Sequence, residues 1–387
     1  MNHKILFLHQ SKSYAGTDAF TINLISGLIK KGYEVELIIN KNKEDLSEFK
    51  GIKLHFYKTT LLTYYASNRC IRLFKKFIII ILYPILILIH TILLLKQIKT
   101  IKPDRIIVVN GGIPGGLLVY IGAIACGISG IKTIYTIHSF VNYQRIINLY
   151  NYILEYVISL YKNITFVTVS NYSRDRIIKD SYHIKNIIVI YNGVPNFNDS
   201  NDNERSSSEF NIAFVGNLIL TKGVEILIDA FNEIHRENTF LYLYVKPIDL
   251  NYLTKIREKI ANNSKITMIL NEHEKKKIYS NKHLIVLPST YESFGQVLIE
   301  AMTFNVPVLG SDGMGIAEVI TIDKNITAGE LFKLGDKDSL KLQLEKLCNN
   351  PYLLNKYSKN CHKIYKKYFS LEIMVNKYIQ LLEKDIL

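Results

Sequence analysis

One pattern occurs twice in this sequence and constrains its fold more than any other feature. Short runs of aliphatic and β-branched residues alternate with longer stretches whose apolar residues recur at helical spacing. Continuous apolar strands joined by helices are typical of a parallel sheet covered by helices on both faces, so the pattern favours an α/β fold. In the first half, the expected strands lie at residues 5–9, 35–39, 52–56, 105–109, 133–137, 164–169 and 187–191.

A polar stretch at residues 196–209 separates the two occurrences of this pattern, and its lack of apolar periodicity is typical of a linker. We therefore expect two tandem, doubly wound Rossmann-like domains, over residues 1–195 and 210–370. Residues 371–387 are expected to form a C-terminal helix that packs back on the N-terminal domain. Ligands of such sheets bind beyond the carboxyl ends of the strands, which predicts a site in a cleft between two facing domains. In the second half, the expected strands lie at residues 212–215, 240–245, 266–270, 284–287 and 306–309.

The charge balance indicates an anionic partner. Lysine and arginine number 48 and aspartate and glutamate 34, which gives a net charge of +14. Such an excess favours nucleic acid, an acidic lipid surface or a phosphorylated substrate. The sequence carries no basic motif interleaved with aromatic residues, so we expect no nucleic-acid partner. The four cysteines form no C-x-x-C pair, which disfavours a zinc site and a disulfide framework and favours a reducing, cytoplasmic compartment.

Residues 77–95 form the most unusual segment, an apolar run nearly long enough for a bilayer core, with lysine and arginine on both sides of it within 69–102. A membrane span would place strands 5–9 and 105–109 on opposite sides of the membrane. Both strands belong to one predicted sheet, and we therefore reject a span. Two interpretations stay open: a buried core helix, or a helix with basic ends that docks on an anionic membrane surface.

Several motifs of nucleotide and hydrolytic chemistry are missing from the sequence. There is no G-x-x-x-x-G-K-[S/T] motif, which disfavours a P-loop ATPase. No strand continues into G-x-G-x-x-G either. The chain also lacks H-E-x-x-H and G-x-S-x-G, which disfavours a metalloprotease and an α/β-hydrolase.

The most informative segment is residues 286–301, where a strand ends, a loop carries an acid and a glycine, and a helix begins near Gly295. The N-terminus of that helix offers free N–H groups and the positive end of the helix dipole, which suit a phosphate group. Glu292 precedes the helix, where a carboxylate can accept hydrogen bonds from two sugar hydroxyls. Glu300 lies among apolar residues, where a charge is costly unless it is hydrogen-bonded, and ribose hydroxyls would serve. The alternative is that Glu292 caps the helix and Glu300 lies at the surface.

Glu292 and Glu300 are spaced as in the E-x7-E motif of retaining glycosyltransferases, and the chain resembles glycosyltransferase family 4 of the GT-B type. Three further segments resemble this family in the same order, Ile190–Val194, Phe214–Phe231 and Pro307–Glu318. The resemblance covers nearly the whole chain and is strongest over 210–320. It implies an enzyme that needs no metal or other cofactor and transfers a sugar from a nucleotide-sugar donor with retention at the anomeric carbon.

The resemblance also implies roles for individual residues. Lys222 would hold the donor diphosphate, Glu292 the sugar hydroxyls and Glu300 the ribose. His138, at the end of a strand, resembles the active-site histidine near the donor sugar, so the catalytic roles fall on His138 and Glu292. The acceptor hydroxyl would attack from the leaving-group face, with a donor phosphate oxygen taking its proton. The remaining residues expected at the donor are Gly16, Gly216, Asn217, Ser293, Phe294, Gly295 and Val297.

Some positions depart from the family pattern. The family usually has an arginine that pairs with the later lysine on the diphosphate, whereas this chain has Asn217. Asparagine can donate a hydrogen bond but cannot neutralise charge, which leaves room for another basic residue to replace the arginine. Met314 replaces the first glycine of a usual pair. Asp18 is expected only to cap a helix, and the histidines other than His138, His9 among them, have no expected role.

We interpret the chain as a cytoplasmic retaining glycosyltransferase at the inner face of the plasma membrane. Its expected partners are a nucleotide-sugar donor, a lipid-linked bacterial surface glycan as acceptor, and an anionic membrane surface contacted through 69–102. The alternatives are a non-catalytic partner of a glycosyltransferase, which Asn217 and Met314 would support, and a GT-B-type sugar-nucleotide epimerase. A basic nucleic-acid binder is the third alternative and would require a steep salt dependence of DNA binding.

Overall fold

The computed structural model describes residues 3–10, 16–40, 46, 49–57, 69–113, 115–141, 148–198 and 209–384. The chain divides into two compact units, which are described separately. Unit 1 comprises residues 1–169, 173–190 and 375–387, and unit 2 comprises residues 170–172 and 191–374. Most of the predicted linker at 196–209 lies outside the described residues.

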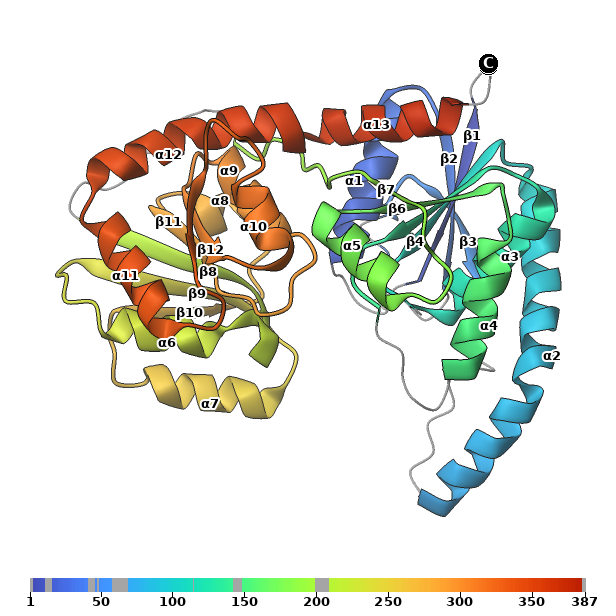
Figure 1. Cartoon of the computed structure of the whole chain (residues 1–387), viewed down its shortest axis with the longest axis horizontal. Coiled ribbons are helices and arrows are strands. Elements are labelled where there is room, and N and C mark those ends of the chain that lie inside the picture. The colour runs from blue at the N-terminus through green and yellow to red at the C-terminus, as the bar shows by residue number, and fades with distance from the viewer. Residues whose placement is uncertain are drawn as a thin grey trace. The chain divides into compact units, whose positions relative to one another are not determined.

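Unit 1 is built on a parallel sheet of seven strands in the order β3-β2-β1-β4-β5-β6-β7 (Figure 1). Each strand expected in the first half is present. Their bounds are β1 Lys4–His9, β2 Glu34–Asn40, β3 Lys53–Tyr57, β4 Arg105–Asn110, β5 Thr133–Ile137, β6 Ile164–Thr168 and β7 Ile187–Val189. In β1, Ile5, Leu6, Phe7 and Leu8 are fully buried, because both faces of the sheet are covered.

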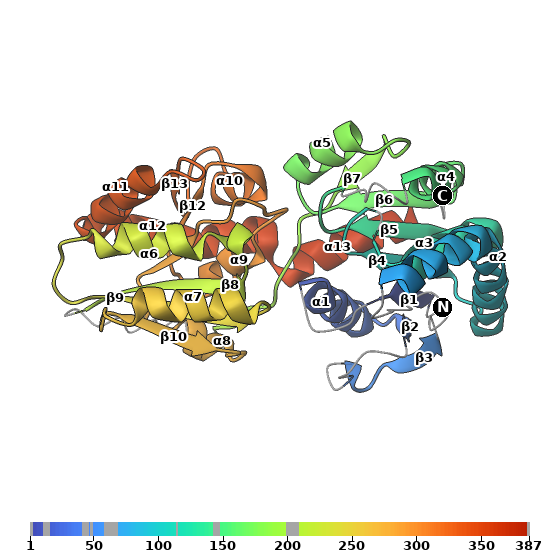
Figure 2. The same ribbon diagram turned by 90° about the horizontal axis from the view of Figure 1, so that it is seen from below.

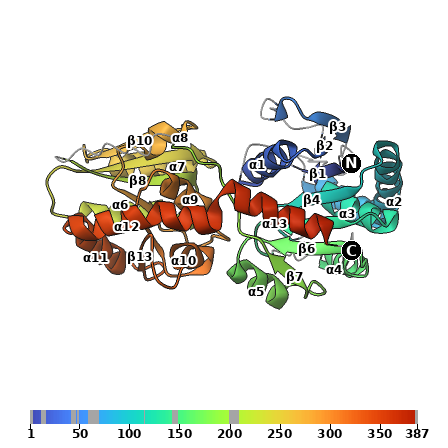
Figure 3. The same ribbon diagram turned by 90° about the horizontal axis from the view of Figure 1, so that it is seen from above.

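The helices of unit 1 cover both faces of this sheet. Helix α3 packs against both α2 and α4. The last helix, α13, lies along α1, where the rings of Phe20 and Tyr378 are 5.8 Å apart and a Cβ at Gly27 would meet Val375 (Figure 3). The bounds are α1 Gly16–Lys30, α2 Arg69–Ile101, α3 Leu117–Ser129, α4 Asn148–Ser159, α5 Asn171–Asp180 and α13 Leu371–Glu383.

The apolar segment expected at 77–95 lies in α2, which is long and has Pro84 inside it. Leu94, Ile98 and Ile101 are buried in the core of unit 1, whereas the opposite face of the helix is exposed. Over residues 84–101 the helix is long and apolar enough to cross a membrane, but only 28% of that window is buried in the protein. The side chains before Pro84 lie outside the described residues. The core interpretation therefore accounts for one face of α2 and leaves the other unexplained.

Unit 2 holds a parallel sheet of six strands in the order β10-β9-β8-β11-β12-β13. Figures 1 and 2 show helices on both faces of it. The strands are β8 Phe210–Leu218, β9 Thr239–Pro247, β10 Ile266–Leu270, β11 Leu284–Leu287, β12 Val308–Ser311 and β13 Gly329–Phe332. The helices are η2 Leu220–Lys222, α6 Val224–Asn232, α7 Leu250–Ile260, α8 Lys275–Tyr279, α9 Gln296–Thr303, α10 Met314–Ile320, α11 Lys337–Cys348, α12 Pro351–Ile364 and η3 Tyr365–Phe369. Two doubly wound sheets confirm the expected fold class; β13, a short edge strand, was not expected.

Candidate functional site

In unit 2 the strand order reverses between β8 and β11, which are neighbours in the sheet although the strands β9 and β10 lie between them in the chain. In open α/β sheets, ligands bind beyond the carboxyl ends of the strands at such a reversal. Two loops leave the sheet there, one after β8 and one after β11. They are joined by a hydrogen bond of 2.8 Å from the backbone N–H of Thr290 to the carbonyl of Thr221.

These two loops bring Lys222 and Glu292 together. The ammonium of Lys222 lies 2.5 Å from Oε2 of Glu292. Both side chains are mostly shielded from solvent, with exposed fractions of 20% and 16%. The residue expected to hold a diphosphate and the residue expected to hold sugar hydroxyls are therefore paired with each other. An anion that binds Lys222 has to compete with this carboxylate.

Glycines shape the turns around this pair. Gly223 and Gly295 both have positive φ, at +70° and +93°. A Cβ at Gly223 would lie 2.2 Å from the carbonyl oxygen of Pro288, so only glycine fits there. Gly295 is the residue that precedes α9, where the first N–H groups of the helix are not used by the helix itself.

The other residues of this loop are oriented by packing. The Phe294 side chain is buried and stacks on Tyr191 with ring centroids 6.1 Å apart, so Phe294 can offer a ligand its backbone but not its ring. The carbonyl of Ser293 accepts a hydrogen bond of 2.7 Å from the hydroxyl of Ser170. Val297, in the first turn of α9, is half-buried.

Glu300 is buried and fully engaged by protein groups. Its Oε2 lies 2.7 Å from the ammonium of Lys275 and accepts a 2.7 Å hydrogen bond from the hydroxyl of Tyr279. Its Oε1 accepts a hydrogen bond of 3.3 Å from the side-chain amide of Gln296. Burial, together with the carboxylate beside it, raises the pKa of Tyr279 well above its usual value. The buried carboxylate of Glu300 therefore has hydrogen-bond partners, as its apolar surroundings require. The sequence analysis did not identify these partners.

Asn217 is exposed near the end of β8, one residue after Gly216. Its register partner in β9 is Lys246. Register partners in neighbouring parallel strands project from the same face of a sheet. Lys246 thus lies next to the position where the resembling family has an arginine, and the sequence analysis did not name it.

A third loop supports Glu292 from the other side. The backbone N–H of Glu292 lies 3.4 Å from Sδ of Met314, and its carbonyl accepts a 3.2 Å hydrogen bond from the N–H of Gly315. Met314 has a φ of +56°, a left-handed conformation that is unfavourable for a side chain of this kind. This strain fits the observation that Met314 stands where the resembling family has glycine.

In unit 1 the strand order reverses between β1 and β4, and His138 follows the adjacent strand β5. Burial, together with the nearby His9, lowers the pKa of His138 to about 3, so its imidazole is neutral near pH 7. Its ring lies 4.2 Å from that of Phe20, and its Nε2 is 3.1 Å from the hydroxyl of Thr136. Gly16, at the start of α1, is exposed.

The sequence analysis missed a buried pair next to His138. His9 ends β1, and its Nε2 lies 3.2 Å from Oδ1 of Asp18 in the first turn of α1. Both side chains are buried, and Nδ1 of His9 has no hydrogen-bond partner among the described residues. Asp18 is therefore more than a helix cap. The signal that could have found the pair is the rule that ligands bind beyond the carboxyl ends of strands at a reversal.

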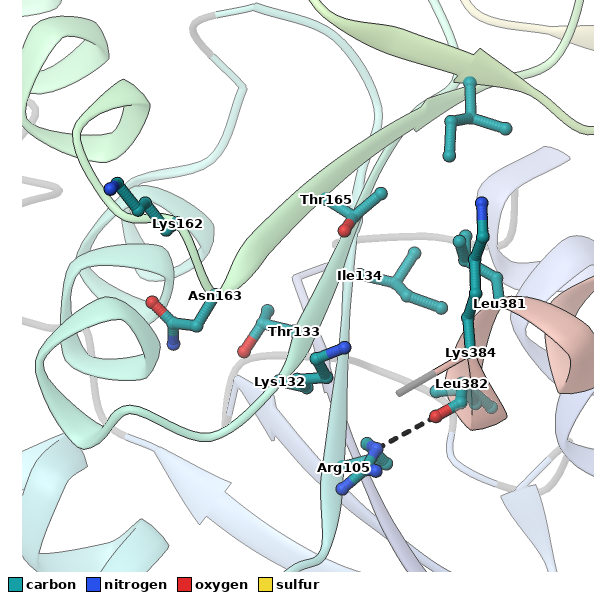
Figure 4. Close-up of a pocket in the computed structure, with 11 residues that line it drawn as sticks. Arg105, Lys132, Thr133, Ile134, Lys162, Asn163, Thr165, Leu381, Leu382 and Lys384 are labelled. Atoms are coloured by element: carbon teal, nitrogen blue, oxygen red, sulfur yellow. Dashed lines mark hydrogen bonds between the residues drawn. The ribbon is translucent and has the colours of Figure 1, made fainter. Parts of the chain in front are cut away.

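Within the described part of the chain, no three His, Cys, Asp or Glu side chains gather in a way that could hold a metal ion. The structure also contains a cavity at the opposite, amino-terminal edge of the unit 1 sheet (Figure 4). None of the expected site residues lines it.

Two family models match this chain. The model described as Glycosyltransferase Family 4 matches residues 14–196, and the model described as Glycosyl transferases group 1 matches residues 196–364. The two models together leave only short ends of the sequence uncovered.

Individual proteins similar to this chain are also named as glycosyltransferases. An uncharacterized glycosyltransferase of Methanocaldococcus jannaschii is 34% identical over 117 residues, which is 30% of each chain. The capsular polysaccharide biosynthesis glycosyltransferase CapM of Staphylococcus aureus is 24% identical over 302 residues, covering 73% of this chain and 77% of CapM. The match to the Methanocaldococcus jannaschii protein thus spans about a third of that protein's length. Among solved structures, Anabaena HepE in complex with UDP and glucose superposes with a TM-score of 0.74 at 18% identity, over 99% of this chain and all of HepE.

Proposed function

We propose that this chain, which belongs to glycosyltransferase family 4 and has the GT-B fold, transfers a sugar with retention from a nucleotide-sugar donor to a lipid-linked bacterial surface glycan. The single observation that supports the proposed nucleotide-sugar donor is the arrangement of residues where the strand order reverses, between β8 and β11. There, Lys222 and Glu292 meet beside the start of α9, and Glu300 lies buried in the second turn of that helix.

The donor assignments follow from charge and hydrogen-bonding capacity. Lys222 and the N–H groups at the start of α9 suit a diphosphate, because both present positive charge or dipole to an anion. Glu292, once released from Lys222, can accept hydrogen bonds from sugar hydroxyls. Ribose hydroxyls can replace the long contact between Glu300 and Gln296 while Lys275 and Tyr279 hold the carboxylate in place. The UDP and glucose bound to HepE make uridine diphosphate sugars the first donors to test.

In the proposed reaction, the bond between the anomeric carbon and the nucleoside diphosphate breaks, and the proton of the acceptor hydroxyl is transferred. The acceptor oxygen bonds to the anomeric carbon on the face from which the nucleoside diphosphate leaves, and a phosphate oxygen of the leaving group takes the acceptor proton. Lys222 and the α9 N-terminus stabilise the charge that develops on the diphosphate, and we expect no metal to be required. His138 is neutral and can hydrogen-bond a sugar hydroxyl, but it is not available as an acid near pH 7.

A thermal-shift screen tests the donor half directly. UDP-, GDP-, ADP- and dTDP-sugars are each added to the purified protein, and a bound donor raises the melting temperature by mass action. We expect a shift with the sugars of one nucleotide and transfer of radiolabelled sugar to glycan extracted from a bacterial envelope. A protein that binds no sugar nucleotide is instead a non-catalytic partner of a glycosyltransferase. A protein that changes the donor sugar without an acceptor is an epimerase.

Lys246 gives a prediction about the diphosphate. If it replaces the family's arginine beside Asn217, Lys246→Ala should weaken UDP binding about five- to tenfold and uridine binding far less, because the loss is one charge-assisted contact to phosphate. Calorimetry with UDP and uridine measures both. Adding Asn217→Arg to the Lys246→Ala chain should restore UDP affinity. Equal affinity of the wild type and Lys246→Ala for UDP would remove Lys246 from the site.

The acceptor half rests on the exposed face of α2. Ile85, Leu88, Ile89, Ile92 and Leu93 are 44% to 60% exposed and share one face of the helix, which continues into exposed Lys96 and Lys99. An apolar face that ends in lysines fits insertion into the headgroup region of an anionic bilayer. We therefore place the protein at the cytoplasmic face of a membrane, where a lipid-linked acceptor is present.

Vesicle binding tests this placement. Leu88→Gln combined with Ile92→Gln should lower association with vesicles that contain anionic lipid by about tenfold, because two apolar side chains no longer insert. Leu250→Gln with Leu342→Gln removes two leucines of unit 2 that are even more exposed, at 75% and 64%, and is the control. If both pairs of substitutions have the same effect, α2 is not the membrane contact.

A further inference from the structure

Three consecutive residues from the first half of the chain belong to unit 2. Ser170–Tyr172 are part of this unit, although the residues on either side of them belong to unit 1. The segment includes the start of helix α5, whose later residues belong to unit 1. Glu318, in helix α10 of unit 2, makes four hydrogen bonds around this segment. The proposed reaction assigns Glu318 no role.

Both carboxylate oxygens of Glu318 accept hydrogen bonds. Oε1 accepts one from the backbone N–H of Asn171 at 2.9 Å and one from the side-chain amide of the same residue at 2.6 Å. Oε1 also accepts the hydroxyl of Tyr191 at 2.7 Å, and Oε2 accepts the backbone N–H of Tyr172 at 3.0 Å. The two backbone N–H groups are the first of α5, where the helix dipole favours a negative charge. Glu318 thus fixes the start of α5 and the side chain of Tyr191.

The groups that Glu318 fixes contact the loop between β11 and α9. The buried hydroxyl of Ser170 donates to the carbonyl of Ser293 at 2.7 Å. The ring of Tyr191 stacks on that of Phe294, with an interplanar angle of 15°. Two consecutive residues of the loop are therefore bound, one by the residue that precedes α5 and one by a tyrosine that Glu318 holds.

Helix α10 also contacts the same loop directly. The N–H of Gly315, in the first turn of α10, donates to the carbonyl of Glu292 at 3.2 Å. Glu318 lies one turn further along the same helix. The contacts therefore form a closed path, from the loop through α10 to Glu318 and back to the loop through Ser170 and Tyr191. Each contact in a closed path limits the movement of the others, so loss of Glu318 should release the loop.

We propose that Glu318 is a positioning residue for the sugar of the donor, because it holds the loop that places the Glu292 carboxylate. This inference rests on the proposed function, in which Glu292 accepts hydrogen bonds from the sugar hydroxyls. The diphosphate is assigned to other groups, Lys222 and the N–H groups at the start of α9. A small displacement of the sugar slows the reaction strongly. Loss of Glu318 should therefore lower the rate of transfer more than the affinity for UDP.

Two substitutions in the full chain, each with a matched control, test the proposal. Glu318→Gln removes the charge that holds the start of α5, and Ser170→Ala removes only the hydroxyl that reaches the loop. The control for the first is Glu155→Gln in unit 1. Glu155 is buried and accepts the backbone N–H groups of His183 at 2.5 Å and Ile184 at 3.1 Å.

The control for Ser170→Ala is Ser181→Ala. Ser181 is also buried, lies in unit 1, and donates its hydroxyl to the carbonyl of Ile184 at 2.8 Å. The two controls thus remove the same kinds of hydrogen bond away from the loop between β11 and α9. Melting curves of all four variants set a temperature at which each of them is folded, and rates are compared there.

Transfer kinetics and UDP affinity give the first readout. We expect kcat to fall about 10- to 30-fold in Glu318→Gln and about fivefold in Ser170→Ala, with UDP affinity by calorimetry within about threefold of the wild type. Both controls should keep the wild-type kcat. Equal losses of kcat in Glu318→Gln and Glu155→Gln would mean that Glu318 only stabilises the fold, and the proposal would fail.

Hydrogen exchange gives a second readout that does not depend on transfer. The peptide over residues 289–296 should exchange at least about threefold faster in Glu318→Gln and Ser170→Ala than in the wild type and the controls, because the loop opens more often. Unchanged exchange of this peptide in both variants overturns the positioning role, whatever the rate of transfer. If the wild type transfers no sugar, the proposed function fails, and the exchange measurement alone decides whether Glu318 holds the loop.

Discussion

Glu292→Gln should lower sugar transfer by about 100-fold or more and at the same time tighten the binding of UDP. The first effect follows because the carboxylate that accepts hydrogen bonds from the sugar is replaced by a weaker, neutral acceptor, a loss of about 2–3 kcal/mol. The second follows because the ammonium of Lys222 lies 2.5 Å from this carboxylate and is paired with it. Removing the negative charge leaves the lysine ready for the diphosphate, which we expect to raise UDP affinity about three- to tenfold.

Opposite changes in transfer and UDP affinity separate this account from a purely structural role. Transfer is measured with a radiolabelled donor and UDP affinity by calorimetry. Glu225→Gln is the matched control, because Glu225 pairs with Lys255 at 2.6 Å elsewhere in unit 2, and both readouts should stay at wild-type values. If Glu292→Gln weakens UDP binding, the ion pair stabilises the loop and does not compete with the donor.

Gly315→Ala should abolish donor binding and lower the melting temperature by several degrees. A Cβ at Gly315 would lie 2.1 Å from the carbonyl oxygen of Ser293 and 2.6 Å from the backbone nitrogen of Phe294. These are backbone atoms of the loop that carries Glu292, so the loop has to move, at an expected cost of about 3 kcal/mol.

Gly313→Ala provides the comparison two residues away. The nearest atom to a Cβ there is a side-chain carbon of Leu334 at 3.4 Å, an ordinary contact. Thermal unfolding and UDP calorimetry on the two variants should therefore differ sharply, with Gly313→Ala close to the wild type. If Gly315→Ala binds UDP normally, the loop around Glu292 does not shape the donor site.

Much of the fold could be read from the sequence, because the buried strands of a parallel sheet are continuous apolar runs. Phe7 and Val108 lie in such runs and are buried in the core of unit 1. Strand β13, Gly329–Phe332, was not predicted, because it is four residues long, contains a glutamate, and forms by pairing with β12. The segment at 77–95 also resisted prediction, since its composition is apolar on both faces while only contact with α3 decides which face is buried.

The sequence predicted which carboxylates belong to the candidate site, but it did not predict which side chains pair with them. The spacing of Glu292 and Glu300 indicated two functional carboxylates, yet nothing in the sequence says that Lys222 binds one and Lys275 the other. Such partners are brought together by the crossing of loops and helices that are distant in the chain. Lys246 was missed for the same reason, because its neighbour Asn217 lies in a different strand. His9 and Asp18 were missed because each has an ordinary role when considered alone.

The central claim is that Lys222, Glu292 and Glu300 hold an activated sugar through its diphosphate, its ring and its ribose. A crystal structure of the protein with a bound sugar nucleotide tests this most directly. We predict that the Lys222 ammonium leaves Glu292 for the diphosphate, that Glu292 contacts sugar hydroxyls, and that Glu300 accepts hydrogen bonds from the ribose. A nucleotide bound elsewhere, with the contact between Lys222 and Glu292 intact, would contradict the account.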